Sequence, residues 1–255
     1  MEKIKNKLDD FSPVGLKDMD NAQLMNRVDT KYVFGLPELP VFLEQLKNDY
    51  LVLDVNGNRI SRYESLYFDT QNFDLYLNHH RGKPSRFKVR FRKYLESSQD
   101  YFEVKVKSNK GRTIKSRIRQ TQSETIRDKA EELLKTKTSL FPEQLEAKLW
   151  VNYSRITLVN KKSPERVTID IGLTFKNNRQ CKTINNLVIA EVKQEKFFAS
   201  PFVKLMKSGH IRQGSISKYC FGVITLFRIK HNNFKHALIK INKLLHPYND
   251  IIAGI

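Results

Sequence analysis

The sequence predicts an α+β fold dominated by an antiparallel β-sheet. Many segments alternate apolar and polar residues with a period of two, the pattern of a strand with two different faces. Segments with helical spacing are few and irregularly placed, which argues against strand–helix–strand units and a parallel sheet. Hydrophobic residues make up 40% of the 255 residues, enough to bury the core of a single domain over residues 1–255.

The alternation predicts about eight strands. They are Arg27–Val33, Arg59–Asp69, Arg86–Tyr94, Tyr101–Lys107, Arg112–Arg119, Lys148–Val159, Glu165–Leu173 and Leu187–Lys193. Helical spacing predicts helices at Leu36–Tyr50, Phe73–His80, Glu124–Leu134 and Pro201–Ser208. The core then covers residues 27–219, and the apolar pattern of residues 219–255 predicts two C-terminal helices packed outside the sheet.

Charge is the most unusual property of the composition. Lys and Arg total 46 against 27 Asp and Glu, which gives a formal net charge of +19. A surplus of this size destabilises the compact state by self-repulsion unless an anionic partner is present. Nucleic acid, anionic lipid, nucleotides and inorganic polyphosphate all meet this condition, so composition alone leaves the partner open.

Nothing in the sequence resembles a signal peptide or a membrane span. The first ten residues lack an apolar stretch, and no apolar run approaches the roughly 20 residues that cross a bilayer. The two cysteines, Cys181 and Cys220, lack metal-site spacing and are expected to be reduced thiols. We expect a cytoplasmic protein, with any attachment to the inner face of a membrane made through a partner.

The polar faces of the predicted strands are mostly basic. The basic positions are Arg27, Lys31, Arg86, Lys88, Arg90, Arg92, Lys105, Lys107, Lys115, Arg117, Arg119, Arg155, Arg166 and Lys193. A few carboxylates stand among them, namely Asp29, Glu103, Asp170 and Glu191. Two architectures fit this pattern: a sheet with a solvated basic outer face, or a closed barrel whose lumen is lined with cations.

Repetition of the basic face from strand to strand favours the barrel. A lumen packed with cations is costly to form empty, and a polyanion with a metal ion would offset that cost. The four carboxylates have the oxygen ligands that hard divalent cations prefer. Nucleic acid is disfavoured, because Phe87, Phe91 and Phe102 lie on the face opposite the cations, whereas RNA-binding sheets present aromatic residues beside them.

Short motifs rich in Lys, Arg and acidic residues follow one another along the predicted core. They are Asp29–Tyr32, Tyr67–Thr70, Lys88–Tyr94, Glu103–Lys107, Gly111–Arg117, Tyr153–Arg155, Thr168–Asp170, Ala190–Lys193 and Ser217–Tyr219. Each motif alone is a weak signal. Their joint order resembles the VTC domain, the polyphosphate polymerase domain of vacuolar transporter chaperone proteins, in the triphosphate tunnel metalloenzyme (CYTH) superfamily.

The resemblance implies a tunnel, a closed barrel of about eight antiparallel strands surrounded by helices. It implies transfer of the terminal phosphoryl group of ATP or another NTP onto polyphosphate, with Mn²⁺ or Mg²⁺ as cofactor and a membrane protein as a candidate partner. The expected catalytic residues are Lys31, Arg90, Arg92, Lys105 and Glu191. Substrate contacts are expected for Lys88, Lys107, Lys115, Arg117, Tyr153, Arg155, Lys193, Ser217 and Lys218. Glu191 is the implied metal ligand, with Glu103, Asp170 and Asp29 as further candidates.

The first strand departs from the hydrolytic members of that superfamily. Those members begin with Glu-x-Glu-x-Lys, whose glutamates hold metal and organise the attacking water, whereas residues 27–31 read Arg-Val-Asp-Thr-Lys. Arg27 replaces a carboxylate, which argues against a dedicated triphosphatase and favours transfer or binding. Three functions stay open: a polyphosphate polymerase, a non-catalytic sensor that binds polyphosphate or triphosphate, and a tripolyphosphatase.

Overall fold

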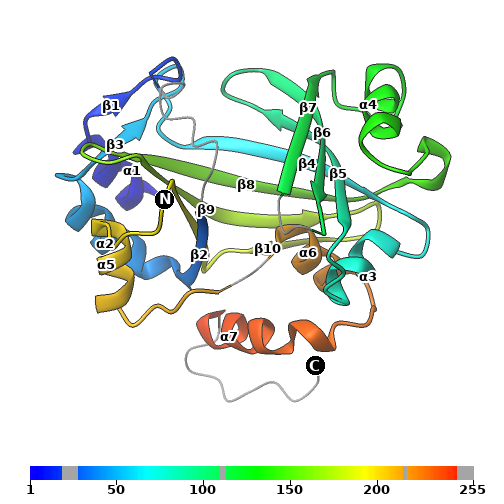
Figure 1. Ribbon diagram of the computed structural model, residues 1–255. Helices are drawn as coiled ribbons and strands as arrows, with labels where there is room; N and C mark the ends of the chain where they lie inside the picture. The colour runs from blue at the N-terminus through cyan, green and yellow to red at the C-terminus, as the bar shows by residue number, and fades with distance from the viewer. Residues whose placement is uncertain (19–27, 110–112, 215–216, 246–255) are drawn as a thin grey trace.

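The structure, a computed structural model, describes residues 1–18, 28–109, 113–214 and 217–245. Its centre is an antiparallel sheet with the strand order β2-β11-β9-β8-β4-β5-β6-β7 (Figure 1). These strands are β2 (Val28–Gly35), β4 (Ser61–Asp69), β5 (Arg86–Tyr94), β6 (Gln99–Lys107), β7 (Thr113–Arg119), β8 (Glu146–Asn160), β9 (Glu165–Lys176) and β11 (Leu187–Gln194). The α+β class and all eight expected strands are therefore present, although Arg27 and Arg112, expected to begin two of them, lie outside the described residues.

Three short strands were not expected from the sequence. β3 (Tyr50–Leu53) pairs with β8, β1 (Pro13–Val14) pairs in parallel with β3, and β10 (Cys181–Ile184) pairs with β9. The helix expected over Leu36–Tyr50 is shorter, because a 3₁₀ turn precedes α2 (Leu39–Leu46) and β3 begins soon after it. Propensity could not locate this boundary, since Tyr50 is fixed by its tertiary contacts.

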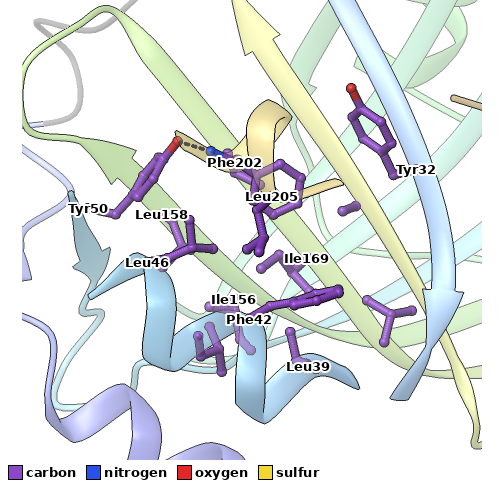
Figure 2. Packing of buried hydrophobic residues seen from close by; sticks show 14 of the residues in the cluster. Tyr32, Leu39, Phe42, Leu46, Tyr50, Ile156, Leu158, Ile169, Phe202 and Leu205 are labelled. Atoms are coloured by element: carbon purple, nitrogen blue, oxygen red, sulfur yellow. Dashed lines mark hydrogen bonds between the residues drawn. The ribbon is translucent and has the colours of Figure 1, made fainter. Parts of the chain in front are cut away.

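The sheet has two chemically different faces, and the apolar one is covered by helices on the outside. α1 (Glu2–Asp9), α2 and α5 (Pro201–Ser208) cover the outward residues of β2, β8, β9 and β11 (Figure 2). Tyr50 links these layers, because its hydroxyl donates to Glu165 on β9 and accepts a hydrogen bond from the Phe202 backbone N–H at 3.1 Å. α4 (Lys129–Lys137) covers the apolar face of β4, β5 and β6 through Ala130 and Leu134.

The expected closure of the sheet into a barrel is not confirmed. Within the described residues, β2 and β7 are the two ends of the hydrogen-bonded order and do not pair with each other. Part of the free edge of β2 is occupied by the segment after α5, because Gln213 bridges to Tyr32 and the Gly214 N–H donates to the Lys31 carbonyl at 2.9 Å. A barrel-closing strand therefore cannot pair with this part of the β2 edge without displacing that segment.

The sheet nevertheless curves until distant strands approach each other. Burial lowers the pKa of Lys105 on β6, and Glu191 on β11 opposes that shift, with Lys31 and Asp29 on β2 also acting on it. In the hydrogen-bonded order, β9, β8, β4 and β5 all lie between β11 and β6. Electrostatic contact across that separation requires a concave charged face. We call this the inner face.

The C-terminal helix α6 (Lys218–Leu226) lies on the inner face, and the expectation of two helices outside the sheet is wrong for it. A Cβ added at Gly222 would lie 2.5 Å from Leu149 and 2.6 Å from Phe175, two inward residues. An irregularity in β9 explains why α6 packs on this face. Gly172 has φ +62° where the β8–β9 register shifts, and such a bulge brings Leu173 onto the face that carries Asp170.

The inner face therefore changes from charged to apolar partway along its strands. The apolar part consists of residues from several strands, including Val33, Leu149, Leu173, Phe175 and Ile189. α6 covers it, and α7 (Lys235–Leu245) adds Leu238 and Ile241 to the same cluster. The remaining helix, α3 (Asp74–His80), joins this cluster to the one that α4 covers. Its Tyr76 belongs to the first cluster and its Leu75 to the second. No helix in the described ranges has the length and apolar character to cross a membrane.

We predict that Gly222→Ala destabilises the protein by about 1–3 kcal/mol, because an overpacked core forces its neighbours to shift. The matched control is Gly214→Ala, where the nearest atom to an added Cβ, Lys240 Nζ, is 4.0 Å away. Urea unfolding followed by circular dichroism measures both. Equal midpoints for the two variants would show that α6 does not pack closely on the inner face.

Candidate functional site

The inner face gathers the residues that the sequence singled out. Directly paired residues of an antiparallel sheet share a face, and Lys31 lies opposite Glu191, Lys88 opposite Lys105, and Arg155 opposite Asp170. The register puts Asp29, Arg90, Arg92, Glu103, Lys107, Lys115, Arg117, Tyr153 and Lys193 on the same face. Ser217 and Lys218 reach it from the start of α6. Every site residue expected from the sequence is thus on one surface.

Glu103 on β6 holds two of the cations. Its carboxylate is 2% exposed and accepts hydrogen bonds from Arg90 Nε and Nη2 at 2.7 and 2.5 Å, and it also contacts Lys115 Nζ. Although burial opposes it, Arg90 and Arg92 hold the pKa of Glu103 well below its usual range. Burial in turn lowers the pKa of Lys115 to about 7. Glu103 therefore stays ionised and fixes the direction of the Arg90 fork.

Asp170 on β9 joins the sheet to α6. Arg155 Nε and Nη2 donate to its two oxygens at 2.6 and 2.8 Å, and Lys218 Nζ lies 2.5 Å from Oδ2. Burial alone would raise the pKa of Asp170, but the two cations lower it to about 2. Removing one member of such a buried group leaves an uncompensated charge and costs about 3–5 kcal/mol. This group holds the first turn of α6 against the charged face.

Glu191 on β11 is the third carboxylate with two cations. Lys31 Nζ donates to its Oε1 at 2.9 Å, and Lys193 Nζ is 3.8 Å from Oε2. Asp29 lies opposite Lys193 on the neighbouring strand, so Asp29 and Glu191 are diagonal neighbours on one face. A cavity of about 370 Å³, lined by Asp29, Lys31 and Gln213 among others, opens beside them.

Lys88 and Lys105 are the opposite case, because neither forms an ion pair with a described carboxylate. They lie directly across from each other on β5 and β6. Two like charges at such positions destabilise the strand pair. Burial lowers the pKa of both side chains. Lys88 Nζ donates to the Ser217 hydroxyl at 2.8 Å. Two neighbouring ammonium groups, one of them hydrogen-bonded to a hydroxyl, form a site that an anion would stabilise.

Arg92 is held by aromatic rings. Its guanidinium lies 5.5 Å from the Tyr63 ring centroid and 5.8 Å from that of Tyr153, and the two rings stack on each other at 5.1 Å. Its Nε donates to Ser65 Oγ at 3.1 Å, and no described carboxylate forms an ion pair with it. Cation–π contacts keep the side chain in place without neutralising its charge. Arg92 is therefore a fixed, buried cation available to a phosphate.

Sequence reasoning missed the contribution of β4. Tyr63, Ser65 and Tyr67 line the inner face, and the Tyr67 hydroxyl accepts a hydrogen bond from Arg90 Nη1 at 2.6 Å. The signal was present in the alternation of Arg59–Asp69, which sets these three residues apart from Leu66 and Phe68. Alternation alone does not mark these three positions as functional, because their side chains carry no charge.

The sequence assigns no role to Asp69, although it lies in the Tyr67–Thr70 motif; in the structure it anchors α6. This fully buried carboxylate accepts hydrogen bonds from the backbone N–H groups of Leu75 and Tyr76 at 2.8 and 2.9 Å, and from the Tyr219 hydroxyl. Tyr219 directly follows Ser217 and Lys218, so the first turn of α6 is bound to β4, β5 and β9 together. The two motifs Tyr67–Thr70 and Ser217–Tyr219 are thereby in contact.

The four expected metal ligands do not meet at one point. Within the described residues, no three His, Cys, Asp or Glu side chains come together. Glu103 and Asp170 each hold two cations at separate places, whereas Glu191 and Asp29 are neighbours. Magnesium-like ions are commonly bound by one or two carboxylates with substrate phosphates as further ligands. The Glu191–Asp29 pair fits that requirement.

The VTC domain family matches residues 26–227. The chain belongs to this family. The resemblance drawn from the motifs is thereby confirmed, and it supports a function that involves polyphosphate or triphosphate. Among curated proteins, no sequence matches the chain.

Solved structures with a similar fold share little sequence with this VTC domain. An adenylyl cyclase candidate from Hippeastrum, with a dominant triphosphatase activity, is 13% identical over 81% of this chain and 100% of its own, with a TM-score of 0.51. An adenylate cyclase candidate from Bacillus halodurans is 14% identical over 80% and 98%, with a TM-score of 0.47. One from Vibrio parahaemolyticus is 12% identical over 77% and 97%, with a TM-score of 0.45. At such identities the likeness concerns the fold alone.

We predict that Tyr219→Phe weakens the binding of inorganic triphosphate, because Ser217 and Lys218 lose the Asp69 anchor. The same change lowers stability by about 1–3 kcal/mol, since a buried charged acceptor loses a donor. The matched control is Tyr76→Phe, which removes a hydrogen bond to the Lys230 carbonyl at 2.8 Å. Calorimetric titration should show weakened binding for Tyr219→Phe alone. Equal losses in both variants would mean that Tyr219 acts only through stability.

Proposed function

We propose that this VTC domain is a polyphosphate polymerase-like enzyme, which transfers the terminal phosphoryl group of ATP or another NTP onto a polyphosphate chain on the inner face. The observation that carries the proposal is the group of Lys88, Lys105 and Arg92 on the inner face, none of which forms an ion pair with a carboxylate among the described residues. Family membership supports the same substrate class.

Phosphoryl transfer asks a protein mainly to position two phosphate groups and to stabilise charge on the equatorial oxygens. Arg90 and Arg92 suit this role because Glu103 and the tyrosine rings hold their forks before substrate arrives. Lys31, Lys88 and Lys105 supply point charges from facing walls of the inner face. The chain end attacks the terminal phosphorus, the bond to the leaving nucleoside diphosphate breaks, and no protein nucleophile is needed.

The remaining site residues extend this surface for a long anion. Lys107, Lys115 and Arg117 follow β6 and β7 beyond the central cations, and Lys193 and Arg155 continue it on β11 and β8. The hydroxyls of Tyr153 and Ser217 are hydrogen-bond donors for phosphate oxygens. Glu191 and Asp29 would hold Mn²⁺ or Mg²⁺, which supplies positive charge to the phosphates when bound. The cytoplasmic location and a membrane-protein partner stay predictions of the sequence.

A non-catalytic sensor that binds polyphosphate is the second candidate. It is favoured by the pairing of Glu103, Asp170 and Glu191 with two cations each, which leaves them less free to bind metal. Hydrolysis is the weakest of the three functions, because Arg27 stands where the hydrolytic members of the superfamily have a carboxylate.

Purified protein incubated with ATP and Mn²⁺, and resolved on a gel that separates polyphosphates by length, tests the function. We predict a ladder of polymer that a chelator abolishes. Orthophosphate without polymer would instead identify a hydrolase. Tight polyphosphate binding without turnover would identify a sensor.

In the same assay, Glu191→Gln should abolish turnover while retaining much of the polyphosphate binding, because the amide keeps the shape but loses the charge that holds a metal. Glu146→Gln is the matched control, since the exposed Glu146 carboxylate pairs with Lys148, and neither residue belongs to the candidate site. Unchanged turnover in Glu191→Gln would refute the metal assignment.

Polyphosphate binding should weaken as the pH rises above about 8. Burial lowers the pKa of Lys193 to about 8. The charges of Arg155 and Arg166 act in the same direction, whereas Glu191 opposes the shift. A bound phosphate raises the pKa of Lys193. At a pH below the pKa of the free protein the lysine is already charged, whereas at a pH above it the lysine must take up a proton when phosphate binds. The loss of affinity approaches tenfold per pH unit for one such group.

Titrations between pH 8 and 9.5 at constant ionic strength measure this effect. Lys193→Met should bind more weakly at pH 8 and show a flatter profile. The ligand's own titration is common to both proteins and cancels in the comparison. An equally steep profile in Lys193→Met would assign the pH dependence to another group.

A further inference from the structure

A second cavity, of about 500 Å³, lies outside the inner face. Tyr32 forms part of its wall, and Tyr32 belongs to the outward residues of β2 because its neighbour Lys31 points inward. The rest of the wall comes from Phe197 between β11 and α5, from Val203 and Lys207 on α5, and from the segment that follows α5. Its volume is within the range of small-molecule sites. None of the roles proposed for the inner face uses it.

The wall of this cavity combines an exposed aromatic ring with an apolar floor. Phe197 is 54% exposed, which is unusual for so large an apolar side chain, whereas Tyr32 in the same wall is almost fully buried. Val203 and Ile211 complete the apolar part. An exposed ring beside an apolar floor offers a stacking surface for a flat heterocycle.

The ionisable groups of the wall, apart from the Tyr32 hydroxyl, are all basic. Lys207, His210 and Arg212 line the cavity, and no Asp or Glu is among its described lining residues. His210 has φ +55°, a left-handed conformation uncommon for a residue with a side chain. Hydrogen bonds from His210 N to the Lys207 carbonyl and from Ile211 N to the Met206 carbonyl hold the turn. Lys240 on α7 donates to the Arg212 carbonyl at 2.9 Å. The backbone that carries His210 and Arg212 is thus fixed at both ends.

We propose that this cavity binds a mononucleotide, with the base against Phe197 and the phosphate between Lys207, His210 and Arg212. An aromatic surface and a group of cations at one cavity match the two halves of such a ligand. Inorganic polyphosphate has no part that would use the ring, and an apolar ligand would leave the cations of Lys207 and Arg212 without an anion. The proposal goes beyond the proposed function, because it concerns another face of the sheet and another ligand.

The cavity adjoins the inner-face site without being part of it. Gln213 lines both cavities, and the segment that contains it reaches the edge of β2 beside Lys31. A nucleotide here would lie against the segment that leads to Ser217. Its effects must therefore be separated from binding on the inner face.

Calorimetric titration of the full chain with AMP tests the proposal. Phe197→Ala and Arg212→Ala should each weaken AMP binding roughly tenfold, since one removes the stacking surface and the other a charged donor. Both residues are exposed, so neither change is expected to affect folding. Adenosine and inorganic phosphate, which each carry one half of the ligand, should bind the unchanged protein more weakly than AMP.

Two matched variants and one variant of the inner face serve as controls for the experiment. Phe141 is 52% exposed and lies elsewhere, so Phe141→Ala should leave AMP affinity unchanged. Lys204 is an exposed α5 residue outside the cavity. Lys204→Ala should therefore also leave AMP affinity unchanged, which controls for the loss of a positive charge. The double variant Lys88→Met/Lys105→Met, altered on the inner face, should still bind AMP.

The proposal is overturned if AMP does not bind at millimolar concentration or if Phe197→Ala and Arg212→Ala bind it normally. Loss of AMP binding in Lys88→Met/Lys105→Met would overturn it as well, because the nucleotide would then occupy the inner face. Failure of the polymer assay has no bearing on these titrations, which involve no turnover. Success or failure here is therefore distinct from that of the proposed function.

Discussion

Closely spaced positive charge on the inner face is the constraint on which this VTC domain depends. Lys88 and Lys105 face each other on neighbouring strands, and burial lowers the pKa of both. An arrangement of this kind is unfavourable in an empty protein, and it is compatible with a stable fold only if other interactions offset it. Three carboxylates provide part of that compensation, each placed between two cations from different positions of the inner face.

The carboxylates also determine which cations are free. Glu103 and Asp170 hold Arg90 and Arg155 through forked hydrogen bonds, which fixes the guanidinium planes but uses part of their charge. Arg92 is fixed differently, by the Tyr63 and Tyr153 rings, and keeps its charge. A site for a polyanion needs both properties: rigid donors, and a surplus of charge that only the ligand neutralises.

The bulge at Gly172 connects this electrostatic arrangement to the packing of the C-terminal helices. It puts Leu173 and Phe175 on the same face as Asp170, so one end of the inner face is apolar and requires a cover. α6 provides the cover with its later residues, while its first turn delivers Ser217, Lys218 and Tyr219 to three different strands. A single helix therefore closes the apolar end and completes the charged one.

The alternation of residues determined the strands, their two faces and the identity of the charged surface, because a period of two is a local property of the chain. The joint order of the motifs also identified the family. Tertiary structure alone decided which cations are neutralised, since the partners of Glu103 and Asp170 come from different strands and from α6. It also decided that the hydrogen-bonded order of the described strands stays open and that α6 lies inside. Both outcomes depend on one positive φ at Gly172 and on the contacts of Gln213 and Gly214 with β2, which a pattern of hydrophobicity does not encode.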